Sequence, residues 1–185
     1  MKRIVLLALI KLAVLTAALS LISSSPAQAQ TFTPFCFGTV SACPCANGGG
    51  PGEGCLNSFG RGGKIDAAGN AQISNDQVVL SASQLPTTAS IIFFQGDAMS
   101  NNGFGTVFGD GLRCADGFTW RIATRIASGG NAYFGIGNDL PVSVKGHLPP
   151  TGGTYHYQGF YRNSASFCTP DGFNLTNGVT IVWTP

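Results

Sequence analysis

The sequence predicts an all-β protein, an antiparallel β-sandwich preceded by a loop region rich in cysteine and glycine. Two observations predict the sandwich. From residue 63 onward, short apolar or alternating runs follow one another, and glycine, proline and asparagine separate them at intervals typical of strands. No window shows a convincing helical period of 3.6 residues. A jelly roll or a barrel uses the same ingredients, so the sequence leaves the strand order open.

Residues 1–29 have the pattern of a secretory signal peptide. Two basic residues precede a long apolar run, and Ala27-Gln28-Ala29 fits the small-residue pattern of a cleavage site. A lysine inside the apolar run argues against the alternative, an uncleaved membrane anchor. We therefore expect export from the cytoplasm and a mature chain of 156 residues that begins near Gln30, enough for one domain.

The charge of the mature chain differs from that of the precursor. Without the signal peptide the chain holds seven basic and eight acidic residues, a net charge of −1. A nearly neutral chain gives no electrostatic reason to expect nucleic acid or an anionic membrane surface as a partner. We expect no nucleic-acid partner and no membrane insertion after cleavage.

Residues 30–62 form the loop region, which we expect to pack on a sandwich domain of residues 63–185. Four of the six cysteines lie among its glycines, namely Cys36, Cys43, Cys45 and Cys55. Its few apolar side chains cannot form a core, so disulfides in an oxidising compartment are the expected source of its order. The spacing does not match the Cys-x2-Cys pairs of a structural zinc site, and we expect no metal there.

All six cysteines are expected to form disulfides, with Cys114 bound to Cys168 and the upstream four paired among themselves. Two cysteines flank Pro44 too closely for an easy mutual bridge. Two upstream arrangements therefore stay open, and we favour the second: Cys36 with Cys43 and Cys45 with Cys55, or Cys36 with Cys45 and Cys43 with Cys55. Six cysteines allow fifteen complete pairings, so sequence alone proves none of them.

The predicted strands are residues 64–67, 77–83, 90–95, 106–108, 119–127, 131–135, 141–145, 154–162 and 179–184. The aromatic run 154–162 is the expected central strand. Because successive strand side chains point to opposite faces, Tyr155, Tyr157 and Tyr161 share one face. Core packing is the favoured interpretation of this tyrosine row, and a stacking platform for sugar rings is the alternative, which requires exposed rings.

Three other strands carry distinct patterns. The run at 90–95 is apolar on both faces, which suits an inner strand covered on both sides. In the run at 119–127, Arg121 and Arg125 share one face with Ala123, and we expect that face to be solvated, with binding of a carboxylate or sulfate as the alternative. The last strand is expected to start at residue 179, because Asn177-Gly178 is a turn signal.

Several segments together resemble a family of secreted bacterial β-domains without assigned function. They are CPC at 43–45, GCLNS at 54–58, FGDGLRC at 108–114, YQGFYR at 157–162 and FNLTNG at 173–178. The resemblance spans nearly the whole mature chain. It implies export and a β-fold, and it supplies no catalytic or ligand-binding residues.

Residues that carry chemistry are few. Neither His147 nor His156 belongs to a nucleophile, zinc-hydrolase or Cys-His motif. Nearly all eight carboxylates lie beside turn residues, where aspartate commonly bonds its own backbone. We expect no catalytic residue and no cofactor. The sequence Asn174-Leu175-Thr176 fits a glycosylation acceptor, to which we assign no role.

Calcium is the metal that the sequence favours most, and only as an alternative. Hard oxygen ligands crowd one loop-rich stretch, namely Asp97, Asn101, Asn102, Asp110 and Asp116. The Asp-x-Asp-x-Asp-Gly spacing of a calcium loop is absent, and we expect no bound metal.

The sequence therefore favours a non-enzymatic extracellular module with a structural or protein-interaction role at the cell surface or in a matrix. Its expected partner is an extracellular protein or glycan. The alternative is a carbohydrate-binding module that uses Trp120, Trp183 or the tyrosine row. A flat row of exposed rings would favour that alternative.

Overall fold

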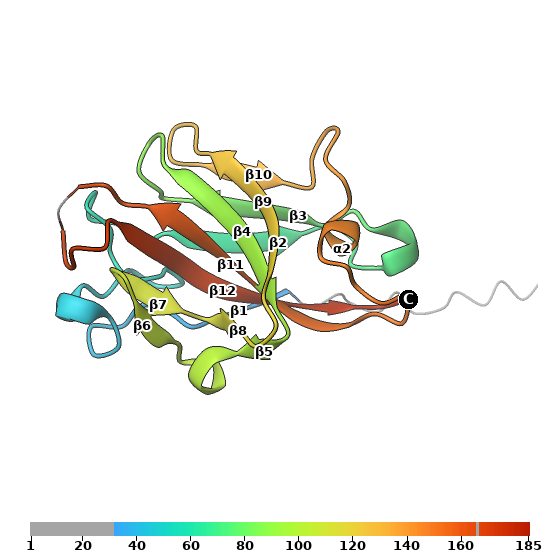
Figure 1. The fold of residues 1–185 in the computed structure, drawn as a ribbon, viewed down its shortest axis with the longest axis horizontal. Helices are drawn as coiled ribbons and strands as arrows, with labels where there is room; N and C mark the ends of the chain where they lie inside the picture. The colour runs from blue at the N-terminus through green and yellow to red at the C-terminus, as the bar shows by residue number, and fades with distance from the viewer. Residues whose placement is uncertain (1–31, 166) are drawn as a thin grey trace, which may run out of the picture.

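A computed structural model describes residues 32–165 and 167–185 of the chain (Figure 1). The signal peptide and the expected start at Gln30 lie outside these residues. The strands are β1 (Phe32–Phe35), β2 (Lys64–Ala68), β3 (Val79–Ser83), β4 (Ser90–Gly96), β5 (Ala98–Met99), β6 (Thr106–Phe108), β7 (Gly111–Arg113), β8 (Ala115–Asp116), β9 (Trp120–Ile126), β10 (Ala132–Phe134), β11 (Gly153–Arg162) and β12 (Phe173–Trp183). The helical turns are η1 (Pro44–Ala46), η2 (Ile73–Asn75), η3 (Ser100–Gly103) and α2 (Val142–Lys145).

Two antiparallel sheets form a β-sandwich. One sheet has the strand order β1-β12-β11-β4-β9, and the other has the order β10-β3-β2. Two short ribbons, β5-β8 and β6-β7, lie beside the larger sheet (Figure 1). The predicted run at 154–162 is the central strand of the five, and the first and last strands of the described chain are neighbours. The predicted all-β fold class is confirmed.

The core lies between the two sheets. Leu80 of β3 and Phe134 of β10 pack in one cluster with Phe93 of β4 and with side chains of β11 and β12. Tyr157 and Tyr161 are fully buried, and burial raises the pKa of both hydroxyls. The tyrosine row is therefore core packing, and its alternative as a sugar platform is wrong.

Trp183 belongs to the same core and is excluded as a sugar-binding ring. Only 2% of the residue is exposed, and its indole Nε1 donates a hydrogen bond of 3.0 Å to the Tyr157 hydroxyl. This bond satisfies the polar end of both rings inside the sandwich, which is the usual requirement for burying tyrosine and tryptophan.

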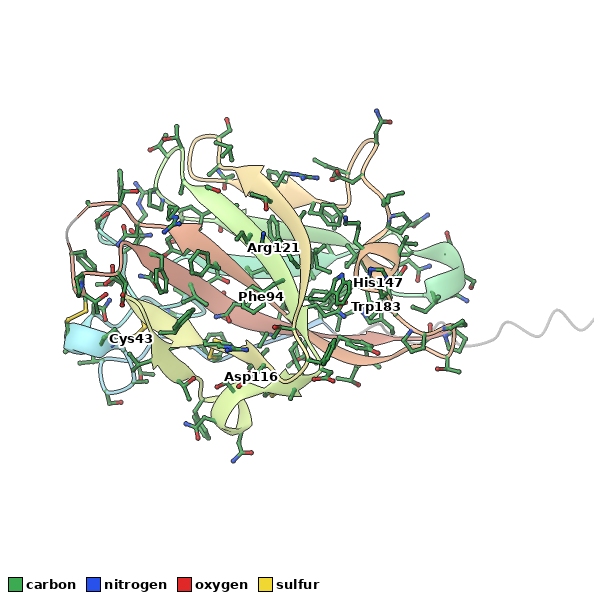
Figure 2. All side chains as sticks on the ribbon, in the orientation of Figure 1. Cys43, Phe94, Asp116, Arg121, His147 and Trp183 are labelled. Atoms are coloured by element: carbon green, nitrogen blue, oxygen red, sulfur yellow. A yellow bond between two sulfur atoms is a disulfide. The ribbon has the colours of Figure 1, made fainter. Side chains whose placement is uncertain are left out.

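Three disulfides are present (Figure 2): Cys36–Cys114 and Cys45–Cys168 connect the loop region to the sandwich, and Cys43–Cys55 lies within the loop region. All six cysteines are bonded, and the pair Cys43–Cys55 belongs to the favoured arrangement. The predicted pairs of Cys114 with Cys168 and of Cys36 with Cys45 are wrong. Such bonds indicate an oxidising compartment.

The physical reason for the incorrect pairing is strand β1. It pairs with β12, the last strand, and so carries the start of the loop region onto the main sheet. Cys36 directly follows β1 and lies with Cys114 and Leu112 in a second buried cluster. Residues 32–35 thus belong to the larger sheet, although the sequence assigned them to the loop region.

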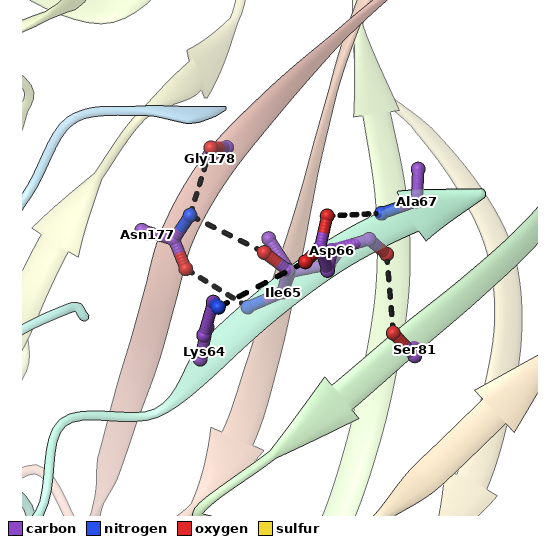
Figure 3. A network of polar contacts seen from close by, with 7 residues as sticks. All are labelled: Lys64, Ile65, Asp66, Ala67, Ser81, Asn177 and Gly178. Carbon is purple, nitrogen blue, oxygen red and sulfur yellow. Dashed lines mark hydrogen bonds and ion pairs between the residues drawn. The ribbon is translucent and has the colours of Figure 1, made fainter. Parts of the chain in front are cut away.

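Asn177 and Gly178 lie inside β12 (Figure 3), so the turn predicted there is wrong. Asn177 Oδ1 accepts a hydrogen bond of 2.8 Å from the Ile65 amide, and its Nδ2 donates one of 3.3 Å to the Ile65 carbonyl. The side-chain amide thereby forms the pair of hydrogen bonds that a neighbouring strand would form with Ile65, and it links β12 to β2 of the other sheet. At Gly178, a Cβ atom would lie 2.5 Å from the Phe35 ring, so glycine is needed for β1 to dock.

Residues 141–145 were predicted to be a strand, and they form the single turn α2 instead. Two valines at alternating positions produced the strand prediction. Pro141 sets the extended start of the turn, and the Ser143 amide donates a hydrogen bond of 2.7 Å to the Asp76 carboxylate. An amide at the start of a helix lacks an intrahelical acceptor, and the carboxylate supplies one.

Gln158 fixes the outer ribbons to the central strand. The side chain is fully buried, and its Nε2 donates hydrogen bonds to the carbonyls of Leu112 (2.8 Å) and Thr176 (2.7 Å). Its Oε1 accepts hydrogen bonds from the amides of Cys114 (2.8 Å) and Ala115 (3.3 Å). One side chain therefore positions β7 and β8 against the face of the larger sheet.

Within the two described ranges, no helix combines the length and the apolar character that crossing a membrane requires.

Candidate ligand-binding groove

A groove of about 570 Å³ lies on the outer face of the five-stranded sheet. Its floor comes from β4 and β11, one wall from the β6-β7 hairpin, and the other wall from the start of β9. Ten residues line it, and they are aromatic, aliphatic or arginine, apart from Thr119. Figure 2 labels Phe94 of the floor and Arg121 of the β9 wall on neighbouring strands.

The floor consists of apolar side chains that point away from the core. Ile92, Phe94 and Phe160 are half-buried, whereas their sequence neighbours Ile91 and Phe93 are fully buried between the sheets. The sequence predicted a strand that is covered on both faces at 90–95. The hairpin covers its outer face only in part, and the uncovered part is the groove.

The hairpin wall is built on an aromatic cluster. The Phe108 ring lies 4.9 Å from the Phe173 ring and 6.4 Å from the Phe160 ring, measured between centroids. Gly109, with φ of 60°, follows directly, and any Cβ at this position would clash with the Phe173 ring. Phe108 remains 45% exposed, so it presents an aromatic face to the groove while it anchors the hairpin.

A β-bulge shapes the opposite wall. Phe93 pairs with Ala123 and Phe94 pairs with Arg121, which leaves Ile122 without a partner on β4. Directly paired residues share a face of the sheet, so Arg121 points to the outer face with Phe94. The bulge thus separates two arginines that the sequence placed on one face.

Arg125 lies on the other side of this strand. Its guanidinium forms an ion pair with Asp139, and it lies 5.1 Å from the centroid of the Phe134 ring. Arg125 is therefore a packed and neutralised residue. The prediction that Arg121 and Arg125 share one face is therefore wrong. It assumed strict alternation of side chains along the strand, and the sequence gives no sign of the bulge that interrupts this alternation.

The groove is positively charged. Arg113 forms an ion pair of 2.8 Å with Asp116, which is not among the lining residues. Arg121 and Arg162 are exposed and form no ion pair with any carboxylate in the described part of the chain. No acidic side chain is among the ten lining residues. The site therefore offers free guanidinium groups beside apolar rings.

Trp120 is among the lining residues, but it pairs with the buried Gln95, so its indole points to the face of the sheet opposite Arg121 and Phe94. It is 40% exposed, and the His147 ring packs edge-on against it with a centroid distance of 4.4 Å. Of the rings that the sequence proposed for sugar binding, Trp120 is accessible on the surface, and Trp183 and the buried tyrosines are not.

The two histidines lie apart from each other and have structural surroundings. His156 Nδ1 lies 2.9 Å from Thr180 Oγ1, and the ring is covered edge-on by Phe35. Burial lowers the pKa of His156, against the opposing effect of the Asp97 charge. The pair resembles a base beside a hydroxyl, but both residues are more than nine-tenths buried, so no substrate can reach them.

The three aspartates considered for calcium each have their own local partners. Asp97 Oδ1 accepts a hydrogen bond from the Phe118 amide, and Asp116 pairs with Arg113. Asp110 is fully buried, and its carboxylate accepts hydrogen bonds from Asn163 and Thr169. Across residues 32–165 and 167–185, no three His, Cys, Asp or Glu side chains form a group that could hold a metal ion.

The glycosylation pattern at residues 174–176 is inaccessible. Asn174 is fully buried, and its Nδ2 donates hydrogen bonds to the carbonyls of Leu56 (2.8 Å) and Cys55 (3.4 Å). This side chain therefore ties β12 to the loop region and cannot carry a glycan in the folded protein.

No family model, curated protein or solved structure matches this chain. The resemblance to secreted bacterial β-domains stays a prediction, and the functional argument depends on the geometry of the groove.

Proposed function

We propose that the protein is a secreted, non-enzymatic module that binds an extracellular macromolecule in the groove. The observation that supports this proposal is a single concave surface. It combines two guanidinium groups that form no ion pair within the described residues with three phenylalanine rings, of which Phe108 is 45% exposed. Such a combination suits recognition, because the rings supply contact area and the arginines fix the orientation of the ligand. The module acts by holding its partner at the cell surface or in a matrix.

The chemistry of the lining favours binding over catalysis. The groove has no histidine, cysteine or carboxylate among its lining residues, and Thr119 supplies its one side-chain hydroxyl. General acid-base or nucleophilic catalysis requires such groups within hydrogen-bond reach of the substrate. Arginine stays protonated at all ordinary pH values and serves as a hydrogen-bond donor only.

The scaffold holds the groove in a fixed shape. Gln158 and the Cys36–Cys114 disulfide secure the segment that continues from the hairpin wall, and the floor strands are paired on both sides. A preformed site binds its ligand without first ordering loops, which favours affinity.

Export is the first part of the proposal to test. The three disulfides support an oxidising compartment, and the signal-peptide pattern predicts a mature chain that begins near Gln30. N-terminal sequencing of protein recovered outside the cytoplasm should give a start at or near Gln30. Recovery of Met1 on a membrane-bound chain would contradict export.

Binding is the second part. The mature protein and the double variant Arg121→Ala/Arg162→Ala would be compared on immobilised acidic polysaccharide, sulfated polysaccharide, neutral polysaccharide and acidic polypeptide. The proposal expects at least one of these to bind the wild type and to lose binding with the double variant. The variant Arg61→Ala, which removes an exposed arginine outside the groove, should bind as the wild type does.

Two results would contradict the proposed function. One is the absence of any binding that depends on the groove arginines. The other is turnover of a bound polymer into smaller products that disappears in the double variant, because the site would then be catalytic.

A further inference from the structure

We infer that the ligand of the groove is an acidic polysaccharide whose sugar rings carry carboxylate groups, bound in extended form along the face of the five-stranded sheet. This inference rests on the proposed binding function and specifies its ligand class. Three features of the groove support it: its one-sided hydrogen-bonding capacity, the exposed Phe108 ring, and the separation of its two free arginines.

The lining offers donors and almost no acceptors. Its polar side chains are Arg113, Arg121, Arg162 and Thr119, and a guanidinium has five N–H donors and no acceptor. A neutral sugar presents hydroxyls that each need an acceptor as well as a donor. A carboxylate presents acceptors only and carries the complementary charge, so it matches this lining.

The rings and the floor favour a sugar chain over a peptide. Phe108 exposes 45% of its surface at one side of the groove, close to the Phe160 ring of the floor, and the apolar face of a sugar ring can stack there. A peptide bound as an added strand needs unpaired backbone groups. The floor strands β4 and β11 are each hydrogen-bonded to a neighbour on both sides, so the floor offers none.

The free arginines are spaced for an extended polymer. Arg121 lies opposite Phe94, and Arg162 follows Tyr161, which pairs with Ile91. The two positions are thus separated by about four residues along β4, or roughly 13 Å at 3.3 Å per residue. A single carboxylate cannot span this length, whereas successive acidic sugars of one chain can contact both guanidinium groups.

The inference commits to a carboxylate, and a sulfate, whose oxygens the guanidinium fork also accepts, is the alternative that the test separates. The planar fork of a guanidinium binds the two oxygens of a carboxylate through two parallel hydrogen bonds. Replacement of arginine by lysine keeps the charge and removes the fork, which gives the experiment a way to separate shape from charge.

The test measures binding of polygalacturonate to the mature protein by titration calorimetry at constant ionic strength. Arg121→Ala and Arg162→Ala should each weaken binding about tenfold, the loss expected for one charged hydrogen-bonded contact. Arg121→Lys should weaken it about threefold. Arg61→Ala should change it less than about twofold, since an exposed charge away from the ligand contributes little.

Three comparison polymers identify the ligand chemistry. Dextran has sugar rings without charge, poly-L-glutamate has carboxylates without sugar rings, and dextran sulfate has sulfates on sugar rings. The inference expects polygalacturonate to bind more tightly than each of them. Melting curves of every variant confirm that the exposed substitutions leave the fold intact.

The possible results separate the inference from the proposed function. Dextran, poly-L-glutamate or dextran sulfate could bind at least as tightly as polygalacturonate, with weaker binding in the arginine variants. In that case the assignment of a carboxylated polysaccharide as the ligand is wrong, and the proposed binding function of the groove is retained. If Arg61→Ala weakens polygalacturonate binding as much as Arg121→Ala does, the attraction is unspecific and the inference fails. If no polymer depends on the groove arginines, the inference and the proposed function both fail.

Discussion

Gln158 shows how one buried side chain can organise an outer layer of the protein. It is fully buried, and its amide forms hydrogen bonds with four backbone groups: the carbonyls of Leu112 and Thr176 and the amides of Cys114 and Ala115. A buried polar group contributes stability when all its partners are present, and its loss leaves those partners unsatisfied. Its effect on stability should therefore exceed that of an ordinary buried glutamine.

We predict that Gln158→Leu lowers the free energy of unfolding by about 4 kcal/mol, because several buried backbone groups lose their partners. Gln95→Leu is the matched control, since Gln95 is buried in the same sheet and donates one hydrogen bond, to the Gly146 carbonyl. Within residues 32–165 and 167–185 its Oε1 has no hydrogen-bond partner, so this change should cost about 1 kcal/mol. Urea unfolding with the disulfides intact measures both losses, and equal losses would contradict the role of Gln158.

His156 should make stability depend on pH. Burial lowers its pKa in the folded protein below the ordinary value of 6.5, so the unfolded chain binds the proton more readily. Burial of the neutral His156 ring contributes fully to the free energy of unfolding above pH 6.5. This contribution is lost progressively as the pH falls from 6.5 toward the pKa of His156 in the folded protein. The unfolding free energy should therefore decrease between pH 7 and pH 5.

The variant His156→Asn should remove this decrease, because asparagine does not titrate. Unfolding measured at several pH values from 7 to 5 checks it. Glu53 does not interfere in this range: burial opposes its ionisation, but hydrogen bonds from the Gly50 and Gly62 amides lower its pKa overall below 4.5. An unchanged decrease in the variant would show that another group is responsible.

At the scale of elements, the docking of β1 depends on a glycine in β12. Phe35 pairs with Gly178, and its ring occupies the space that a side chain at Gly178 would need. Two kinds of contact therefore hold β1 on the sheet: its backbone hydrogen bonds to β12, and the packing of the Phe35 ring on the backbone of Gly178. This contact places Cys36 beside its partner Cys114.

We predict that Gly178→Ala destabilises the protein by about 2 kcal/mol through overpacking against Phe35. In a Phe35→Ala background the same change should cost nothing, or stabilise by about 0.5 kcal/mol, because alanine loses less backbone entropy than glycine. Thermal unfolding of both single variants and the double variant measures the coupling. Additive effects would mean that the ring and the glycine do not interact.

The elements that the sequence predicted well are those whose burial pattern is local. The runs at 64–67, 90–95 and 154–162 became β2, β4 and β11 with similar bounds, since each alternates or is continuously apolar. The strand β1 was missed because its four residues contain Pro34, and β7 because its Gly111 is a turn signal. β1 is a strand because the distant strand β12 supplies its hydrogen bonds, whereas β7 pairs with its neighbour β6 in a hairpin.

The candidate site was less predictable than the fold. Trp120 and the possibility of anion binding by Arg121 came from the sequence, but the grouping with Phe94, Phe108 and Arg162 did not. That grouping requires a hairpin folded onto a sheet and an unpaired Ile122, neither of which has a local sequence signal. The same is true of the disulfides, whose partners are separated by 78 and 123 residues in the two long bridges.

At the scale of the molecule, the two long disulfides should differ in their effect on stability. The chain-entropy model gives about 4.5 kcal/mol for Cys36–Cys114 and about 5 kcal/mol for the longer Cys45–Cys168. Only the first is buried in an apolar cluster, where its removal also creates a cavity. We predict that replacing Cys36 and Cys114 by alanine costs about 1 kcal/mol more than replacing Cys45 and Cys168.

Denaturant unfolding of the two double variants checks this order, and peptide mapping without reduction checks the pairing itself. A greater loss on removal of the exposed bridge would show that loop length, and not burial, decides the contribution. A peptide that links Cys114 to Cys168 would contradict the structure.

The Cys45–Cys168 bridge also determines how the protein responds to a pulling force. The shortest covalent route from Phe32 to Pro185 passes through this bond and includes only residues 32–45 and 168–185, roughly 30 residues. At about 3.5 Å per extended residue, the chain can lengthen to roughly 110 Å, whereas the reduced chain would reach about 540 Å. The floor strands β4 and β11 lie between Cys45 and Cys168, in the segment that this disulfide closes into a loop. A force applied between Phe32 and Pro185 would therefore extend the oxidised protein over a short distance and leave the groove strands outside the stretched segments.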